Sequence, residues 1–199
     1  AEGYQEMENN DFKAVSFDGE TCEIVEYIGD GGEVVVPAKM TDTSRKEYTV
    51  TSVTASLFAY KSEITKVSFE EGTAITELPA SFLAFKTTDN SSGVADETLV
   101  INLPATIKKF NDEAVRTYKT IGGITSGENA DIVDFTNAEE FAAQSMDCLG
   151  DTFKAKTLAF SGNLKSMAYS AFRASNIGTF LFKEGNYENT EIGVKVENR

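Results

Sequence analysis

Two pairs of carboxylates come nearest to a catalytic arrangement in this sequence. They are the adjacent residues Glu70 and Glu71, and Asp131 with Asp134. A glycoside hydrolase needs two carboxyl groups about 5 to 9.5 Å apart, one acting as acid and one as base or nucleophile. The chain has 32 acidic residues, so close pairs are expected without function, and it has no tryptophan to line a sugar cleft. A glycan-acting enzyme is therefore the third of three hypotheses.

The residue patterns needed for nucleophilic catalysis, phosphate binding and metal binding are missing from the sequence. The sequence has no histidine, which excludes Ser-His-Asp and Cys-His arrangements and the commonest transition-metal ligand. The glycine-rich phosphate motifs are absent, and Gly29–Gly32 is interpreted as a turn. Calcium binding would use Asp131, Asp134 or the pair Asp18 and Glu20, but the spaced Asp/Asn-Gly loop pattern is missing. We expect no catalytic residues, no metal site and no cofactor.

Composition limits the partners of the chain. The 199 residues include 41% hydrophobic ones, which is ordinary for a globular domain, and the net charge is −14. This charge disfavours contact with nucleic acid or anionic lipid, and no apolar run is long enough to span a membrane. Cys22 and Cys148 fall in different repeats, so we expect small buried hydrophobes and no disulfide. Asn90 begins a glycosylation sequon, which indicates an exposed loop.

A short hydrophobic frame recurs along the chain. It consists of one apolar residue, a second three positions later, and a mostly apolar pair seven and eight positions after the first. Five copies begin at Val50, Ile75, Ile107, Ala138 and Leu164. Units this short cannot bury their own apolar face, so neighbouring units must stack. The spacing of the final pair suits a helical turn that points into the stack.

Strand-like stretches alternate with these frames. They are Val34–Val36, Ile64–Phe69, Leu99–Leu103, Asp131–Phe135, Thr157–Phe160 and Ile177–Phe182. Alternation in each strand predicts an inward ladder that ends at Phe180 and Phe182. The segments Lys86–Gly93 and Gly122–Asn129 are predicted to be loops.

The outward row of these strands is the candidate ligand-binding surface. Its residues are Lys66, Ser68, Val100, Asn102, Ile132, Asp134, Ala159, Thr179 and Leu181. Val100, Ile132 and Leu181 are apolar where a solvated sheet face is usually polar, which favours a protein contact. The alternative is that β-propensity alone accounts for them.

The start of the chain is predicted in two parts. Residues 1–11 have few apolar groups and are expected to be a flexible leader. Residues 12–37 are expected to form a capping hairpin, with its turn at Asp18-Gly19, followed by the first strand. Residues 38–199 then form the repeat array with a C-terminal cap, all within one domain.

At these residues the chain resembles the leucine-rich repeat superfamily and, within it, the BspA-like bacterial surface proteins. The matching stretches are Val50–Val53, Ile64–Phe69, Val100–Pro104 and Ala171-Phe172, and the resemblance covers about residues 22 to 184. The glycine of the family pattern is replaced at Thr54, Pro79, Asn111, Ala142 and Ala168, which is typical of degenerate repeats. The resemblance implies export to the cell surface and contact with host or neighbouring molecules.

Together, the frame and the resemblance predict a right-handed α/β solenoid of leucine-rich-repeat type. Short parallel strands would alternate with helical or irregular turns behind an N-terminal hairpin. The expected function is a non-catalytic extracellular binding or adhesion module for a protein or glycan ligand. The second hypothesis is a structural spacer of the cell envelope.

Overall fold

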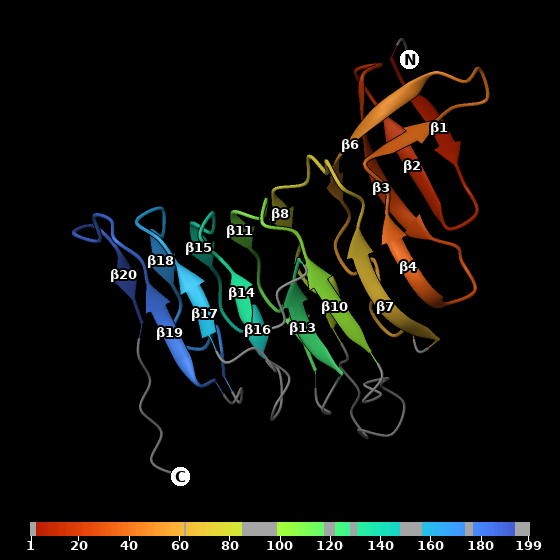
Figure 1. Cartoon of the computed structure of the whole chain (residues 1–199). Coiled ribbons are helices and arrows are strands. Elements are labelled where there is room, and N and C mark those ends of the chain that lie inside the picture. Colours follow the sequence, from red (N-terminus) through yellow and green to blue (C-terminus); the bar gives the residue numbers. More distant parts are fainter. Residues whose placement is uncertain are drawn as a thin grey trace.

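The computed structural model of this chain is built from strands alone (Figure 1). It describes residues 3–61, 63–84, 99–117, 122–127, 131–147, 157–173 and 177–193. Within these ranges there are twenty strands, arranged in five sheets, and no helix. A curled sheet at the N-terminal end is followed by an array of parallel sheets that extends to the C-terminal end (Figure 1).

The N-terminal sheet has five strands in the order β1-β2-β3-β6-β5. These are β1 (Gln5–Glu8), β2 (Phe12–Ser16), β3 (Thr21–Tyr27), β5 (Lys39–Thr41) and β6 (Glu47–Val53). The predicted hairpin is present as the antiparallel pair β2 and β3. In place of a flexible leader, residues 5–8 form β1, which pairs with β2. Met7 explains the difference, because this single apolar side chain is buried inside the sheet.

The hairpin turn between β2 and β3 is closed by the carboxylate of Asp18. Its Oδ1 accepts hydrogen bonds from the backbone N–H groups of Glu20 and Thr21, both at 2.8 Å. Its Oδ2 accepts a hydrogen bond from the Thr21 hydroxyl at 2.5 Å. The hydroxyl of Thr21, followed by these backbone N–H groups, holds the pKa of Asp18 well below its usual range. Asp18 therefore stabilises the turn.

One face of the array consists of two parallel sheets, which contain the six predicted strands and one strand that was not predicted. The first contains β4 (Gly32–Val36), β7 (Ile64–Phe69), β10 (Val100–Leu103) and β13 (Gly123–Ser126). The second contains β14 (Ile132–Asp134), β17 (Thr157–Phe160) and β19 (Thr179–Phe182). Strands of successive repeats pair in parallel in both sheets.

One of the two predicted loops is wrong. The segment Gly122–Asn129 contains β13, which pairs with β10 so that Ile124 lies opposite Ile101. Ile124 is fully buried. One apolar residue is enough to form a strand here, because the edge of β10 provides the backbone hydrogen-bond partners. The other predicted loop, Lys86–Gly93, lies outside the described residues, as do Asn90 and Cys148.

The opposite side of the array is made of two-residue strands. One sheet contains β8 (Glu77–Leu78), β11 (Lys109–Phe110), β15 (Glu140–Phe141), β18 (Ser166–Met167) and β20 (Glu191–Ile192). The other contains β9 (Leu83–Ala84), β12 (Val115–Arg116) and β16 (Met146–Asp147). These short strands stand where helical turns were expected. The prediction of an α/β solenoid is therefore wrong for the described chain.

Two features of the backbone explain why the frames form no helix. The residue before the final frame pair is left-handed in four copies, with φ between 55° and 60° at Ser56, Ser81, Glu113 and Gln144. A left-handed residue interrupts a right-handed helix and turns the chain. In addition, the backbone donors bond to the next repeat, as in Leu83 N–H to Ala114 O and Val115 N–H to Ser145 O. An α-helix would need those groups for bonds within its own segment.

The frame residues nevertheless form the core. The apolar members of the second and third copies are at most 2% exposed, including Phe82 and Phe110. Phe110 stacks on Phe141 of the following repeat with ring centroids 4.6 Å apart. At the end of the array the predicted inward pair Phe180 and Phe182 is 41% and 42% exposed. Burial at the ladder positions thus depends on having a neighbouring strand on each side.

An ionic cluster joins three successive repeats behind the core. The carboxylate of Asp147 lies 3.2 Å from Nε of Arg116 and 2.9 Å from Nη2 of Arg173. Arg116 also pairs with Glu113 at 2.7 Å. The side chains of Asp147 and Arg116 are only 7% and 13% exposed. Asp147 therefore neutralises one cation from the preceding repeat and one from the following repeat.

The Asp18 turn predicts a specific pH dependence. Because the native pKa is depressed, Asp18 stabilises the fold fully above its unfolded pKa, near 4, and loses that contribution as the pH falls through the native pKa. Wild type should therefore be more stable than Asp18→Asn at pH 7, and the difference should shrink below about pH 4. Urea unfolding at pH 7, 5 and 3 measures it. A difference that does not change with pH contradicts the role of the charge.

Ser145 predicts a stabilising substitution. Its side chain is fully buried, and its hydroxyl has no hydrogen-bond partner among the described residues. Alanine occupies the same frame position at Ala114 and Ala171. Removing an unsatisfied buried hydroxyl should stabilise the protein by about 1 kcal/mol. Ser145→Ala should raise the urea midpoint, whereas Ser44→Ala on an exposed turn should not. A lower midpoint would show that the hydroxyl is satisfied in solution.

The Asp147 cluster predicts a large loss of stability. Asp147→Ala removes the inter-repeat carboxylate of the nearly buried Arg116, which keeps Glu113 as a partner, so we expect a loss of about 1.5 to 3 kcal/mol. Lys165→Ala serves as the control, since it removes an exposed pair with Glu139 and should leave the unfolding midpoint near wild type. Urea unfolding compares the two variants. Equal small effects would mean that the cluster contributes no more than a surface pair.

Candidate functional site

The parallel register places the predicted ligand-binding row in two groups. Val100 lies opposite Lys66 on β7 and Gly123 on β13, and Asn102 lies opposite Thr125. The remaining predicted residues stand on the second sheet. There the register aligns Ile132 with Thr157 and Thr179, and Asp134 with Ala159 and Leu181. The row expected to be continuous is therefore divided between β13 and β14, which belong to different sheets.

Most of the predicted row reaches the surface in part. Lys66, Ser68, Val100 and Asn102 are half-buried, as are Ile132 and Asp134. Thr179 and Leu181, on the outermost strand, are exposed. Ala159 differs from the prediction, because it is 1% exposed and offers no contact surface. Its short side chain lies on the middle strand, β17, between Asp134 on β14 and Leu181 on β19.

The sheet of β4, β7, β10 and β13 carries an exposed apolar residue beside this row. Val35 on β4 lies opposite Ser68 and is 48% exposed. Together with Val100 it gives the face a mixed character, with valines next to Lys66, Ser68 and Asn102. A solvated sheet face is usually polar throughout. This surface therefore has the composition of a contact surface.

A hollow of about 250 Å³ opens at the carboxyl ends of β7 and β10. Phe69, Asn102 and Pro104 line it together with Glu70 and Glu71. The turn after β7 closes with a hydrogen bond from Thr73 N–H to Glu70 O, and Gly72 takes a left-handed conformation there at φ 80°. This turn exposes both glutamates at the rim. The fold thus brings the carboxylate pair next to a member of the predicted row.

The carboxamide of Asn102 is the unusual group in this hollow. Its Oδ1 atom is buried and has no hydrogen-bond donor among the described residues. Thr106, which also lines the hollow, donates its hydroxyl hydrogen to Ile75 O at 2.7 Å and is not directed at Asn102. A buried acceptor without a donor costs roughly 1 to 3 kcal/mol. A ligand or water that donates to Oδ1 would recover that energy.

Sequence reasoning located the components of this hollow without connecting them. Asn102 was placed on the strand face, and Glu70 with Glu71 was considered only as a catalytic pair. The other candidate pair does not join them. Asp134 accepts hydrogen bonds from Thr136 at 2.9 Å (N–H) and 2.6 Å (hydroxyl), so its carboxylate closes a turn. No sequence signal indicated that the turn after β7 would bend toward Asn102.

The residues considered as calcium ligands do not come together in a site within the described ranges. The Asp18 carboxylate is occupied by the hairpin turn, as described above. Across the described ranges no group of three or more His, Cys, Asp or Glu residues is arranged to hold a metal ion. Burial, with a smaller contribution from the charge of Asp18, raises the pKa of the Cys22 thiol to about 11. Cys22 is thus a buried neutral thiol, as predicted.

Comparison with protein-family models, curated proteins and solved structures finds no match to this chain. Within the part of the chain that the structure describes, no helix has the length and apolar character needed to cross a bilayer. The function must therefore be inferred from the surface itself.

Proposed function

We propose that this chain is a binding module that recognises a protein or glycan ligand through the face of β4, β7 and β10 and the hollow at the ends of β7 and β10. The proposal includes export to the cell surface, as in the BspA-like proteins that the repeats resemble. Ligand recognition by the face of a parallel array suits this architecture, because side chains from successive repeats stand at a regular spacing.

The buried Oδ1 of Asn102 is the observation that carries the proposal. A folded protein rarely leaves a buried acceptor unpaired unless a ligand or water completes it. Asn102 and the apolar ring of Phe69 both line the hollow. A ligand with a hydroxyl or amide donor and a neighbouring apolar surface would fit both features.

The carboxylates at the rim define the ligand further. Glu70 and Glu71 are exposed acceptors on the same side of the hollow. Lys66 lies on β7, two residues before Ser68 on the outer face, and its ammonium group can donate to a ligand oxygen. Hydroxyl groups can donate to the carboxylates and accept from the lysine, which favours a ligand rich in hydroxyl or amide groups. Both glycans and polar protein segments meet this description.

Binding assays with immobilised extracellular matrix proteins, mucin and polysaccharides test the proposal. Val100→Glu places a charge in the middle of the face, and Asn102→Leu replaces the carboxamide by an apolar side chain of similar size. Each should weaken binding about tenfold or more, which corresponds to roughly 1.4 kcal/mol. Ile192→Glu is the matched control, because Ile192 is 43% exposed on β20, away from this face, and should leave binding unchanged.

Three results would overturn the proposal. Retained binding in both face variants would place recognition elsewhere on the molecule. A folded wild-type protein that binds none of these ligands would favour the envelope spacer. Cleavage of a polysaccharide that is lost in Glu70→Gln would favour a glycan-acting enzyme.

A further inference from the structure

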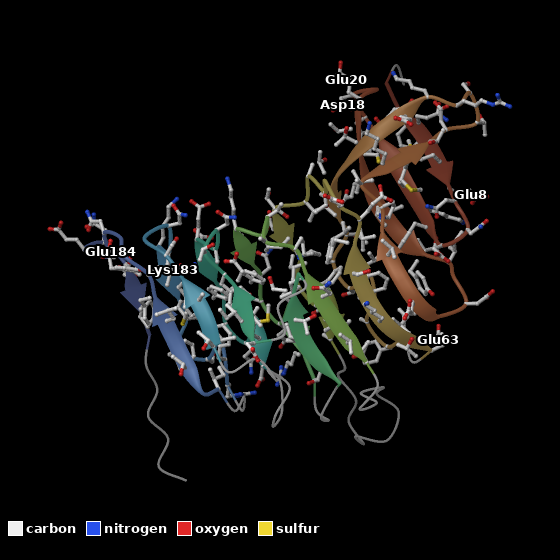
Figure 2. All side chains as sticks on the ribbon, viewed as in Figure 1. Glu8, Asp18, Glu20, Glu63, Lys183 and Glu184 are labelled. Atoms are coloured by element: carbon white, nitrogen blue, oxygen red, sulfur yellow. The ribbon has the colours of Figure 1, made fainter. Side chains whose placement is uncertain are left out.

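Negative charge is concentrated in the first part of the chain. Residues 1–33 contain ten acidic side chains and one lysine, a net charge of −9 out of the total of −14. Figure 2 shows Glu8, Asp18 and Glu20 at the N-terminal end of the molecule, far from Glu184. The segment that contains β1, β2 and β3 is therefore the most acidic part of the chain, whereas residues 34–199 hold 22 acidic and 17 basic side chains.

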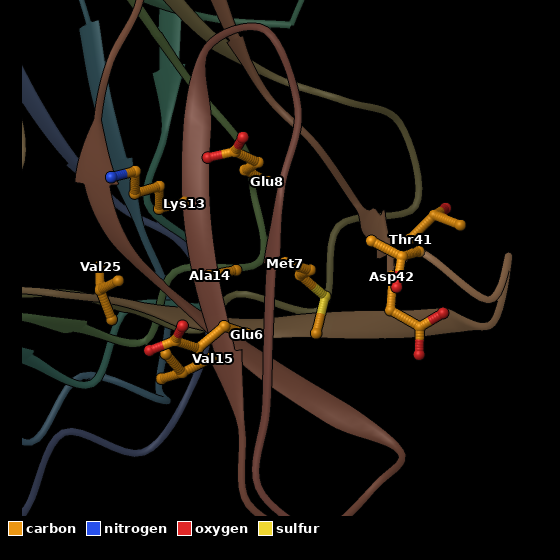
Figure 3. Close-up of a pocket in the computed structure, with 10 residues that line it drawn as sticks. Glu6, Met7, Glu8, Lys13, Ala14, Val15, Val25, Thr41 and Asp42 are labelled. Atoms are coloured by element: carbon orange, nitrogen blue, oxygen red, sulfur yellow. The ribbon is translucent and has the colours of Figure 1, made fainter.

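This sheet also contains a groove of about 520 Å³, the larger of the two hollows described here. The side chains that line it come from β1, β2 and β3 and from the end of β5 (Figure 3). Met7 and Ala14, which also line it, are buried and alternate along their strands with the outward residues Glu6, Glu8 and Val15. Val25 adds an apolar side chain that is 36% exposed. On its outer side the groove thus combines the apolar side chains of Val15 and Val25 with charged residues.

Strand register shows how the charges lie across this surface. One row contains Glu8, Lys13 and Glu26, and the next contains Glu6, Val15 and Glu23. Lys13 pairs with Glu26 at 3.8 Å, so the single cation is already engaged. The two rows therefore hold four carboxylates and one ammonium group.

The carboxylates on β1 are available to a ligand. Glu6 accepts a hydrogen bond from the Tyr4 hydroxyl at 2.7 Å. This bond from Tyr4 to Glu6 raises the pKa of the Tyr4 phenol, as expected beside an anion. Glu8 has no hydrogen bond or ion pair with another described residue. By contrast, Asp42 at the far end of the groove accepts from Ser44 N–H at 2.8 Å and from the Tyr48 hydroxyl at 3.0 Å.

The geometry decides how a ligand would enter. An added strand between β1 and β5 would need a gap of nearly 10 Å, twice the spacing of neighbouring strands. Cα atoms of β1 and β5 lie within 8 Å of each other. The gap between β1 and β5 is therefore too narrow for another strand. A peptide ligand must bind through its own side chains and not by strand pairing. Glu6 and Glu8 point to the same side of β1, about 6.6 to 6.8 Å apart along the strand.

We propose that this groove binds an extended peptide segment with a basic residue at every second position. In an extended chain, alternate side chains point to the same side with the same repeat as Glu6 and Glu8. The ammonium or guanidinium groups would pair with these carboxylates, and their alkyl stems would cover Val15 and Val25. This site is separate from the strand face proposed above and does not depend on it.

Fluorescence anisotropy with two labelled peptides of equal composition tests the spacing. The first is Lys-Ser-Lys-Ser-Lys-Ser-Lys, and the second is Lys-Lys-Ser-Ser-Ser-Lys-Lys. The full chain should bind the alternating peptide about fivefold or more tightly at low salt, and added salt should weaken binding. Equal affinity for the two peptides would reduce the effect to general electrostatic attraction and overturn the proposal.

Paired variants test the location. Glu6→Gln with Glu8→Gln should weaken binding of the alternating peptide about tenfold or more. Glu184→Gln with Glu188→Gln removes the same charge at the opposite end and should change binding less than about twofold. Val25→Ser should weaken binding without changing the charge, and Val100→Glu on the other site should not weaken it. Equal losses in the two charge variants would contradict a site on β1.

Discussion

Backbone hydrogen bonds between successive repeats are the interaction on which this structure depends. They run in an unbroken series along the array, from Lys108 N–H to Thr76 O and from Glu139 N–H to Lys108 O. The series continues from Lys165 N–H to Glu139 O and from Glu191 N–H to Lys165 O, with all four distances between 2.7 and 2.9 Å. A single repeat cannot satisfy these groups alone, and buried unpaired groups are costly. Stacking is therefore required by the backbone as well as by the apolar side chains.

The same constraint explains what the sequence could predict and where it failed. The frame identified which residues are buried, because burial depends on the spacing of apolar side chains and holds whether the segment is helical or extended. It did not identify the local conformation. Spacings of three and four residues match a helix, but they also suit an extended segment that turns at a left-handed residue such as Ser81 or Glu113. A glycine at these positions would have indicated a left-handed conformation, whereas serine and glutamate do not.

Prediction of the candidate site was limited for a related reason. Alternation along one strand places Val100 and Asn102 on the outer face, since side chains alternate with a period of two. The neighbours across the sheet are set by register and by the path of the turns, which the pattern of one strand does not contain. The hollow beside Asn102 arises from the turn at Glu70–Thr73, and the groove beside Glu6 arises from the curl of a five-stranded sheet. Ala159 shows the same limit, since it is buried although alternation along its strand places it on the outer face.

The two ends of the array illustrate how position in the stack controls the surface. Phe160 is fully buried, whereas Phe182, its register partner on the next strand, is 42% exposed. Their sequence contexts are similar, and the difference is that no described strand pairs with the outer side of β19. At the other end, the curled sheet of β1, β2, β3, β5 and β6 contains antiparallel pairs, and Phe12 and Met40 are buried there. The outer face of β1, β2 and β3 carries Glu6, Glu8, Glu23 and Glu26, and residues 1–33 hold a net charge of −9 out of the total of −14. Within the array, the stacking of neighbouring repeats thus determines which side chains are buried. The N-terminal sheet can instead combine a packed inner face with a strongly acidic outer face.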